Sequence, residues 1–294
     1  MNVAEPQSAV QSPQQIAAQS GSSFLIGFRC LPAERRAAMT TVYAFCRVAD
    51  DAVDDATTPE EGAAHLAFWR TELGLVTGGA PTTPVGRELQ QVVQKFGGGI
   101  EPYRELLDGM EMDLHHEGYR DLEALELYCH RVASAPGLAC LPVLGATSDG
   151  AREFSQWLGR ALQLTNILRD LRSDMEEGRI YAPADWLDAS GVQAEWLGGT
   201  GPSEVYASDG PVARLTQRIA VAARERFART ESVLAQLSPQ ERKNLVPARI
   251  MGAVYRSLLS RLEQRGGDLR GPRVRVSKLR RLSIALAMMV GLRG

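Results

Sequence analysis

The segment QLTNILRDLRSD, residues 163–174, combines two patterns that decide the fold. Its leucines and isoleucine recur at helical spacing and form an apolar stripe. Asn166, Asp170 and Asp174 follow one another every four residues on a different face, and Gln163 lies one turn before Asn166. Short oxygen ligands at this spacing suit Mg²⁺, which takes a few carboxylates and completes its shell with water and substrate phosphate. We therefore predict a helix that packs with one face and binds with the other.

A second acidic helix face is found in the segment YAFCRVADDAVDD, residues 43–55. Tyr43, Arg47, either Asp50 or Asp51, and Asp54 share that face. Like charges one turn apart destabilise an isolated helix, so this group of aspartates indicates a compensating cation. A single Asp-rich turn is usually a solvated helix end. Two such faces far apart in the sequence, each with an arginine beside it, favour a shared metal site instead.

Helical periodicity and glycine or proline breaks predict an all-α protein. The 294 residues include 44% hydrophobic residues, which is enough for a sizeable core. Few segments alternate with a period of two residues, and no internal repeat is found. Residues 1–19 are rich in Gln, Ser, Ala and Pro, so we predict a disordered tail and not a signal peptide. Residues 20–294 are expected to form one domain.

Charge and cysteine content exclude several classes of protein. The formal net charge of -2 gives no reason to expect a nucleic-acid partner. The four cysteines, Cys30, Cys46, Cys129 and Cys140, have no CxxC spacing and are predicted to be reduced in a cytoplasmic protein. No apolar run reaches the length that a membrane-spanning helix needs.

Two further segments allow two interpretations each. Residues 20–24, SGSSF, could offer hydroxyl and N–H donors to a phosphate or could form a plain loop. Residues 132–137, VASAPG, are small and could leave room for a bulky apolar group or let two helices pack closely.

Arg179 lies near Asp174 and could supply forked donors to phosphate oxygens.

These segments, in this order, resemble the squalene/phytoene synthase family of head-to-head prenyl transferases. The resemblance covers about residues 20–285 and rests mainly on the two long aspartate-bearing segments. It implies a single-domain isoprenoid-synthase helical bundle around a central cavity. It also implies that Mg²⁺, or Mn²⁺ in its place, joins aspartates to the diphosphates of two prenyl substrates.

Residue roles carried over from the family form three overlapping groups. The metal ligands implied are Asp50, Asp54, Asn166, Asp170 and Asp174. The residues implied to act in catalysis are these four aspartates with Tyr43, Arg47 and Tyr181. The substrate-binding residues implied are Ser20, Ser22, Ser23, Arg47, Tyr128, Val132, Gln163, Asn166, Arg169, Arg179 and Arg273.

The subtype most resembled is the hopanoid-associated presqualene diphosphate synthase, on the basis of residues 20–24 and of Arg131 to Ser134. The implied substrate is farnesyl diphosphate, and the product would pass to downstream squalene or hopanoid enzymes. The alternatives are a phytoene or dehydrosqualene synthase, a full squalene synthase that uses NADPH, and a non-catalytic homologue that acts in assembly or binding. Pro136 and Arg275 depart from the family's usual residues.

The C-terminal segment is basic and then apolar. Eight basic residues lie between Arg261 and Arg281, and the apolar run 282–292 follows them. This pattern is typical of contact with an anionic membrane surface, here the inner face of the membrane, and equally of a helix packed on the bundle.

Overall fold

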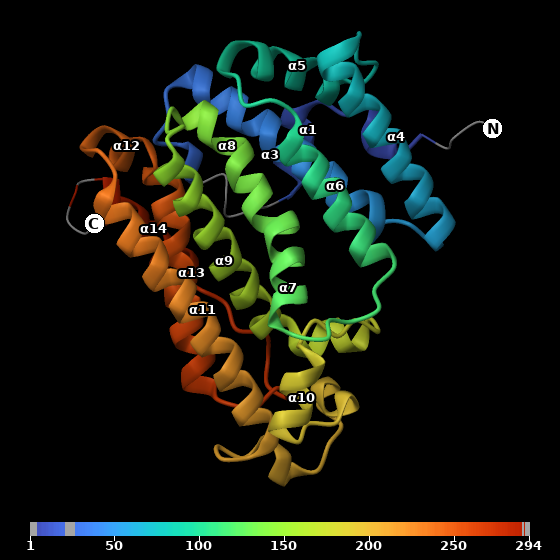
Figure 1. Cartoon of the computed structure of the whole chain (residues 1–294), viewed down its shortest axis with the longest axis vertical. Helices are drawn as coiled ribbons and strands as arrows, with labels where there is room; N and C mark the ends of the chain where they lie inside the picture. Colours follow the sequence, from blue (N-terminus) through green and yellow to red (C-terminus); the bar gives the residue numbers. More distant parts are fainter. Residues whose placement is uncertain (1–4, 21–26, 290, 292–294) are drawn as a thin grey trace.

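The computed structural model describes residues 5–20, 27–289 and 291, and every regular element within them is a helix (Figure 1). The all-α prediction is confirmed. The α-helices are α1 (Pro13–Ser20), α3 (Ala33–Asp54), α4 (Pro59–Gly78), α5 (Pro84–Phe96), α6 (Glu101–Leu114), α7 (Leu122–Cys129), α8 (Ala135–Leu144), α9 (Asp149–Glu176), α10 (Ala184–Ser190), α11 (Pro211–Gln236), α12 (Pro239–Asn244), α13 (Val246–Arg265) and α14 (Lys278–Met289). The described residues also form three 3₁₀ turns, η1 (Gln7–Val10), η3 (Ala194–Gly198) and η4 (Ser203–Tyr206), and one π-helical turn, η2 (His130–Ser134).

Side-chain caps fix where several helices begin. Thr58, Thr83, Asp121, Ser148 and Ser238 each accept a hydrogen bond from a backbone N–H in the first turn of the helix that follows. Each such cap satisfies a donor that the helix leaves unpaired and stabilises the helix by about 1 kcal/mol. Local sequence therefore determines these boundaries.

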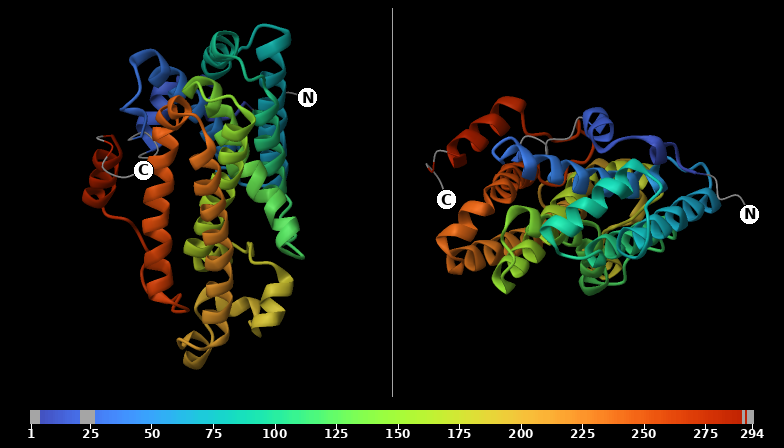
Figure 2. Two further views of the ribbon diagram at one scale, coloured as in Figure 1. Left: turned by 60° about the vertical axis from the view of Figure 1, so that its left-hand side comes forward. Right: turned by 90° about the horizontal axis from the view of Figure 1, so that it is seen from above.

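Helix α9 lies at the centre of the bundle. It packs along α11 and also contacts η2, α8 and α13 (Figures 1 and 2). The apolar stripe predicted for residues 163–174 is buried, as Leu164, Ile167, Leu168 and Leu171 are at most 4% exposed. The opposite face of the same helix remains free to line a cavity.

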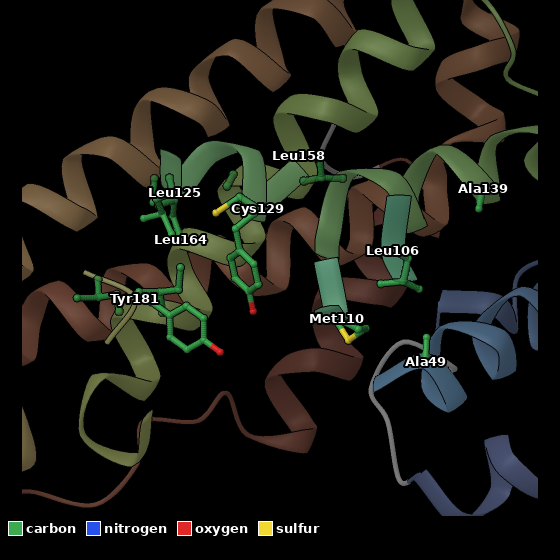
Figure 3. Close-up of a cluster of buried hydrophobic side chains, with 14 of the residues drawn as sticks. Ala49, Leu106, Met110, Leu125, Cys129, Ala139, Leu158, Leu164 and Tyr181 are labelled. Atoms are coloured by element: carbon green, nitrogen blue, oxygen red, sulfur yellow. The ribbon is translucent and has the colours of Figure 1, made fainter. Parts of the chain in front are cut away.

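One contiguous hydrophobic core connects the helices, and its residues run from Ile16 to Val276. Figure 3 shows part of this core, with side chains from α3, α6, α7, α8 and α9 and from the segment that follows α9. The labelled side chains are Ala49, Leu106, Met110, Leu125, Cys129, Ala139, Leu158, Leu164 and Tyr181. The core thereby holds the cavity-facing helices in fixed positions.

The prediction of a disordered tail over residues 1–19 is wrong for residues 7–10 and 13–19, which are helical. The Ser12 N–H donates to Gln15 Oε1 at 2.8 Å, and the Gln15 N–H donates to Ser12 Oγ at 3.3 Å. This reciprocal cap starts α1. Ile16 and Ala17 are then buried, and α1 packs against α3. Two apolar side chains and one cap order a segment whose composition indicates disorder.

Candidate active site

A cavity of about 780 Å³ lies between the helices that carry the aspartates. Its walls come from α3, α6, α8, α9 and α13, from the segments at residues 128–133, 179–181 and 273, and from Ser20 of α1, Phe28 and Arg281 of α14. The predicted site residues that line it are Ser20, Tyr43, Arg47, Asp50, Asp54, Tyr128, Val132, Gln163, Asn166, Arg169, Arg179, Tyr181 and Arg273. Residues separated by more than two hundred positions are thus brought to one site.

Helix α3 presents Tyr43, Arg47, Asp50 and Asp54 to this cavity. The alternative between Asp50 and Asp51 is resolved, because Asp51 does not line the cavity and accepts a hydrogen bond from Arg47 Nε at 3.1 Å. Asp50 forms no ion pair with an arginine among the described residues. Burial, and then the neighbouring Asp54 carboxylate, raise the pKa of Asp50 to about 7.

Helix α9 presents Gln163, Asn166 and Arg169 to the same cavity. Asn166 Nδ2 donates to Gln163 Oε1 at 3.2 Å, which fixes the orientation of both amides. Asn166 Oδ1 is buried and accepts no hydrogen bond within the described part of the chain. A buried acceptor without a partner is destabilising, so this oxygen is available to a donor or a cation.

Asp170 and Asp174 do not line the cavity themselves. Arg273 donates to Asp170 through Nε and Nη2, both at 2.6 Å, and Arg169 Nε donates at 2.9 Å. Burial opposes ionisation of Asp170, but these hydrogen bonds outweigh it and lower the pKa of Asp170. Burial, followed by the charges of Asp170 and Glu177, raises the pKa of Asp174 to about 7.

Arg179 connects the two acidic regions. Its backbone N–H donates to the carbonyl oxygen of Asp174 at 2.8 Å, because the chain turns directly after α9. Its guanidinium Nη1 lies 3.6 Å from Asp54 Oδ1 at the end of α3. A cation that reaches both helix ends is well placed for an anion bound between them.

Asp113 on α6 is a cavity residue that the sequence analysis missed. Tyr181 OH donates to its Oδ1 at 2.7 Å, and Tyr128 OH donates to its Oδ2 at 2.9 Å. The two tyrosine rings stack with their centroids 5.2 Å apart. Burial raises the pKa of Asp113 to about 6, although both hydroxyls oppose that rise. The segment before residue 115, GMEMDL, holds Glu111 as well as Asp113, so the sequence does not single out Asp113.

The Ile180 N–H donates to His116 Nε2 at 2.9 Å, which fixes the segment that carries Tyr181. Burial lowers the pKa of His116, in keeping with a neutral imidazole that accepts a hydrogen bond. His116 thus acts as a structural residue that orients the segment before Tyr181.

The remaining cavity wall is apolar and partly built from the small-residue segment. Val132, Ala133, Pro136 and Gly137 face the cavity together with leucine, methionine and phenylalanine side chains. The segment also packs closely on α9, because a Cβ on Gly159 of α9 would lie 2.5 Å from the backbone of Ser134. Both interpretations of residues 132–137 therefore hold, since the segment lines the cavity and also packs closely on α9. Its π-helical turn is a feature often found at functional sites.

The SGSSF segment is described only at Ser20. Ser20 lines the cavity, and its Oγ donates to the Ala17 carbonyl oxygen at 2.9 Å. The substrate-binding roles predicted for Ser22 and Ser23 lie outside the described residues.

The donor set fits a hard divalent cation in part. The Asp54 carboxylate repels the negative charge of Asp50, and a bound cation would offset this repulsion. Asn166 Oδ1 has no hydrogen-bond partner in the described structure. No three His, Cys, Asp or Glu side chains among the described residues gather closely enough to hold one metal ion. Mg²⁺ commonly binds through one or two carboxylates, with waters and substrate phosphates as its other ligands. The residues present suit that mode and not a cage made of protein ligands alone.

Comparison with known proteins agrees with this geometry. The squalene/phytoene synthase family model matches residues 17–280. The chain is 36% identical to a presqualene diphosphate synthase of Rhodopseudomonas palustris, over 90% of this chain and 92% of that protein. It is 33% identical to a phytoene synthase of Mycobacterium tuberculosis, over 97% and 92%. A crystal structure of a dehydrosqualene synthase in complex with ligand superposes with a TM-score of 0.80 at 26% identity, covering 95% of each chain. The chain therefore belongs to the squalene/phytoene synthase family of prenyltransferases.

Proposed function

We propose that this enzyme condenses two farnesyl diphosphates head to head, with 1′-2-3 connectivity, to presqualene diphosphate in a Mg²⁺-dependent reaction. The observation that carries the proposal is the single cavity that joins two aspartate-bearing helices to an apolar wall. Polar groups at one side suit diphosphates, and the apolar side suits prenyl chains. Several relatives that cover most of the chain are named presqualene diphosphate synthases, which supports this subtype.

The first step is ionisation of the donor substrate. The C–O bond breaks, and its electron pair leaves with the diphosphate. Arg47, Arg169, Arg179 and Arg273 face the cavity and would stabilise the charge that develops on this leaving group. Bound Mg²⁺, held by Asp50, Asp54, Asn166, Asp170 and Asp174, would add further positive charge there.

The second step joins the two prenyl chains. The allylic carbon of the donor bonds to the 2,3 double bond of the acceptor, and loss of one proton closes the cyclopropane. The products are presqualene diphosphate, diphosphate and a proton, so atoms and charge balance. The apolar wall would keep water away from the cation, while Tyr43, Tyr128 and Tyr181 lie at the cavity surface.

Product analysis tests the proposal directly. Purified protein is incubated with farnesyl diphosphate and Mg²⁺, with and without NADPH, and in parallel with geranylgeranyl diphosphate. We expect presqualene diphosphate from farnesyl diphosphate whether or not NADPH is present. Squalene that forms only with NADPH would identify a full squalene synthase. Phytoene from the longer substrate would identify a carotenoid enzyme, and no turnover with either substrate would favour a non-catalytic role.

A further inference from the structure

The outer face of α14 is apolar although it is exposed to solvent. Leu279 is 81% exposed, Leu282 50%, Leu286 51% and Met289 48%. Their spacing of three and four residues places them in one stripe along the helix. Ala285, at the edge of this stripe, is buried where α14 packs against α13 at the periphery of the bundle (Figure 2). We call these four residues the α14 stripe.

The α14 stripe differs from ordinary exposed hydrophobic residues because it is continuous. Elsewhere in the described chain, the large hydrophobic side chains that are comparably exposed are Val10, Leu127 and Val221, each on a different element. Single exposed hydrophobic residues are normal on soluble proteins. Several on one helix face indicate a surface that another apolar phase covers.

The charge around the α14 stripe is uniformly positive. Residues 269–289 contain no acidic residue and six basic ones, namely Arg270, Arg273, Arg275, Lys278, Arg280 and Arg281. Arg270 and Arg273 pair with aspartates, whereas Arg275, Lys278 and Arg280 form no ion pair with any described residue. A face-to-face contact between two copies of α14 would bring these unpaired cations together. An anionic surface complements them.

The position of α14 links this surface to the cavity. Arg281 lies on α14 and lines the same cavity as Arg273 and Asp50. The helix therefore borders the site where, on the proposed function, a long-chain apolar product forms. No helix in the described ranges is long and apolar enough to cross a membrane, and the 12 residues of α14 are too few to do so.

We propose that α14 binds in the plane of an anionic lipid bilayer. The α14 stripe enters the boundary between headgroups and acyl chains, and Lys278 and Arg280 contact the anionic headgroups. This is the binding mode of amphipathic helices that combine leucines on one face with basic residues beside them. The mouth of the cavity is thereby held at the membrane surface, into which an apolar product can pass without crossing water.

The test is a vesicle flotation assay on the full chain without substrate, so its outcome is independent of the proposed reaction. We expect binding to vesicles that contain phosphatidylglycerol and much weaker binding to pure phosphatidylcholine. Leu282→Gln combined with Leu286→Gln should lower the partition coefficient about tenfold or more, because two apolar side chains no longer enter the bilayer. Lys278→Gln combined with Arg280→Gln should lower it by about tenfold at low salt and less at high salt.

A matched control replaces apolar side chains of similar exposure elsewhere. Leu127 on α7 and Val221 on α11 are 48% and 47% exposed, so Leu127→Gln combined with Val221→Gln should leave binding unchanged. Circular dichroism checks that all variants fold. Equal loss in the control, no loss in the α14 variants, or no binding by the unmodified chain would each overturn the proposal. A dimer that the leucine substitutions convert to a monomer would show that a second copy covers the α14 stripe instead.

Discussion

The two aspartate-bearing helices carry the same residue type at the same spacing, yet Asp50 on α3 and Asp170 on α9 are in opposite electrostatic states. On α3, Asp50 lies against Asp54 without an arginine of its own, and its pKa rises to about 7. On α9, Asp170 is held by Arg169 and Arg273, and its pKa is lowered. The comparison shows that spacing alone does not determine what an aspartate pair needs. Asp50 has no ion pair among the described residues and would gain most from an external cation, whereas Asp170 already has two arginines.

This difference assigns distinct tasks to the two helices. Arg273 lines the cavity while it holds Asp170, so it can exchange a carboxylate for a substrate diphosphate of similar geometry. Such an exchange would leave Asp170 with Arg169 as its remaining arginine and open one side of the carboxylate to a metal ion when a diphosphate arrives. On α3, a metal ion would instead relieve repulsion that exists before substrate binds.

The largest expected effect comes from removing one carboxylate on either helix. Asp54→Ala and Asp170→Asn should each lower kcat by at least about 10²–10³-fold, because the charge on the departing diphosphate loses part of its stabilisation. Steady-state consumption of farnesyl diphosphate is the measurement. Asp55→Ala is the matched control, since Asp55 is exposed beside Asp54 and does not line the cavity. Unchanged consumption by either site variant would remove that aspartate from the reaction.

The next effect sharpens the contrast at Asp170. Arg273→Gln removes both hydrogen bonds that the guanidinium donates to Asp170, and we expect kcat/KM to fall about 10–100-fold. The pKa of Asp170 should rise when that arginine is lost, so the acid limb of the pH–rate profile should move to higher pH. Arg273→Lys should keep the positive charge but not the paired hydrogen bonds, so its pH–rate profile should lie between those of the unmodified enzyme and Arg273→Gln. A uniform fall in rate at every pH would instead assign Arg273 to substrate binding alone.

A smaller effect is expected at Asp113, which belongs to neither helix. Asp113→Asn keeps the size of the side chain but weakens the hydrogen bonds from Tyr128 and Tyr181, and kcat should fall about tenfold. Tyr128→Phe removes one of the same two bonds without changing Asp113. If Asp113 acts only by positioning tyrosines, the two variants should share one pH–rate profile. A pH limb near 6 that disappears only in Asp113→Asn would show that Asp113 itself titrates in the reaction.

Asp113 also shows where sequence reasoning ended. The faces on α3 and α9 could be predicted because helical periodicity places residues four apart on one side, and most residues inferred from family resemblance do line the cavity. Asp113 is one of five acidic residues in α6, and none of the others lies three or four positions from it on the same face, so spacing does not mark it. Its environment comes from Tyr128 and Tyr181, which only the folded chain brings together.

The ion pair between Asp170 and Arg273 could not be predicted for the same reason, because the two residues are 103 positions apart and only the folded chain brings them together. The tail prediction failed for a different reason. Composition over 1–19 suggests disorder, but one reciprocal cap and the burial of Ile16 outweigh that average. Local periodicity thus predicted the helices and their polar faces, whereas the contacts between distant segments became known only from the folded structure.

The smallest effect concerns stability and tests the α3 side of the comparison. The folded-state pKa of Asp50 is about 7, raised from 3.8, so the fold favours its protonated form. Its stabilising contribution is complete below pH 3.8 and is lost as pH rises through about 7. The melting temperature without metal should therefore fall by several degrees from pH 5.5 to pH 8. Asp174 shares the direction and adds to the fall.

Asp50→Asn should flatten this decline, because an amide has no proton to lose, whereas Asp55→Asn should not. Mg²⁺ with diphosphate should raise the melting temperature of the unmodified chain more at pH 8 than at pH 5.5, since ligand and proton compete for one carboxylate. The same addition should stabilise Asp50→Asn less and with little dependence on pH. Equal stabilisation of both proteins at both pH values would show that α3 does not contribute to cation binding, and the contrast between the helices would then be structural only.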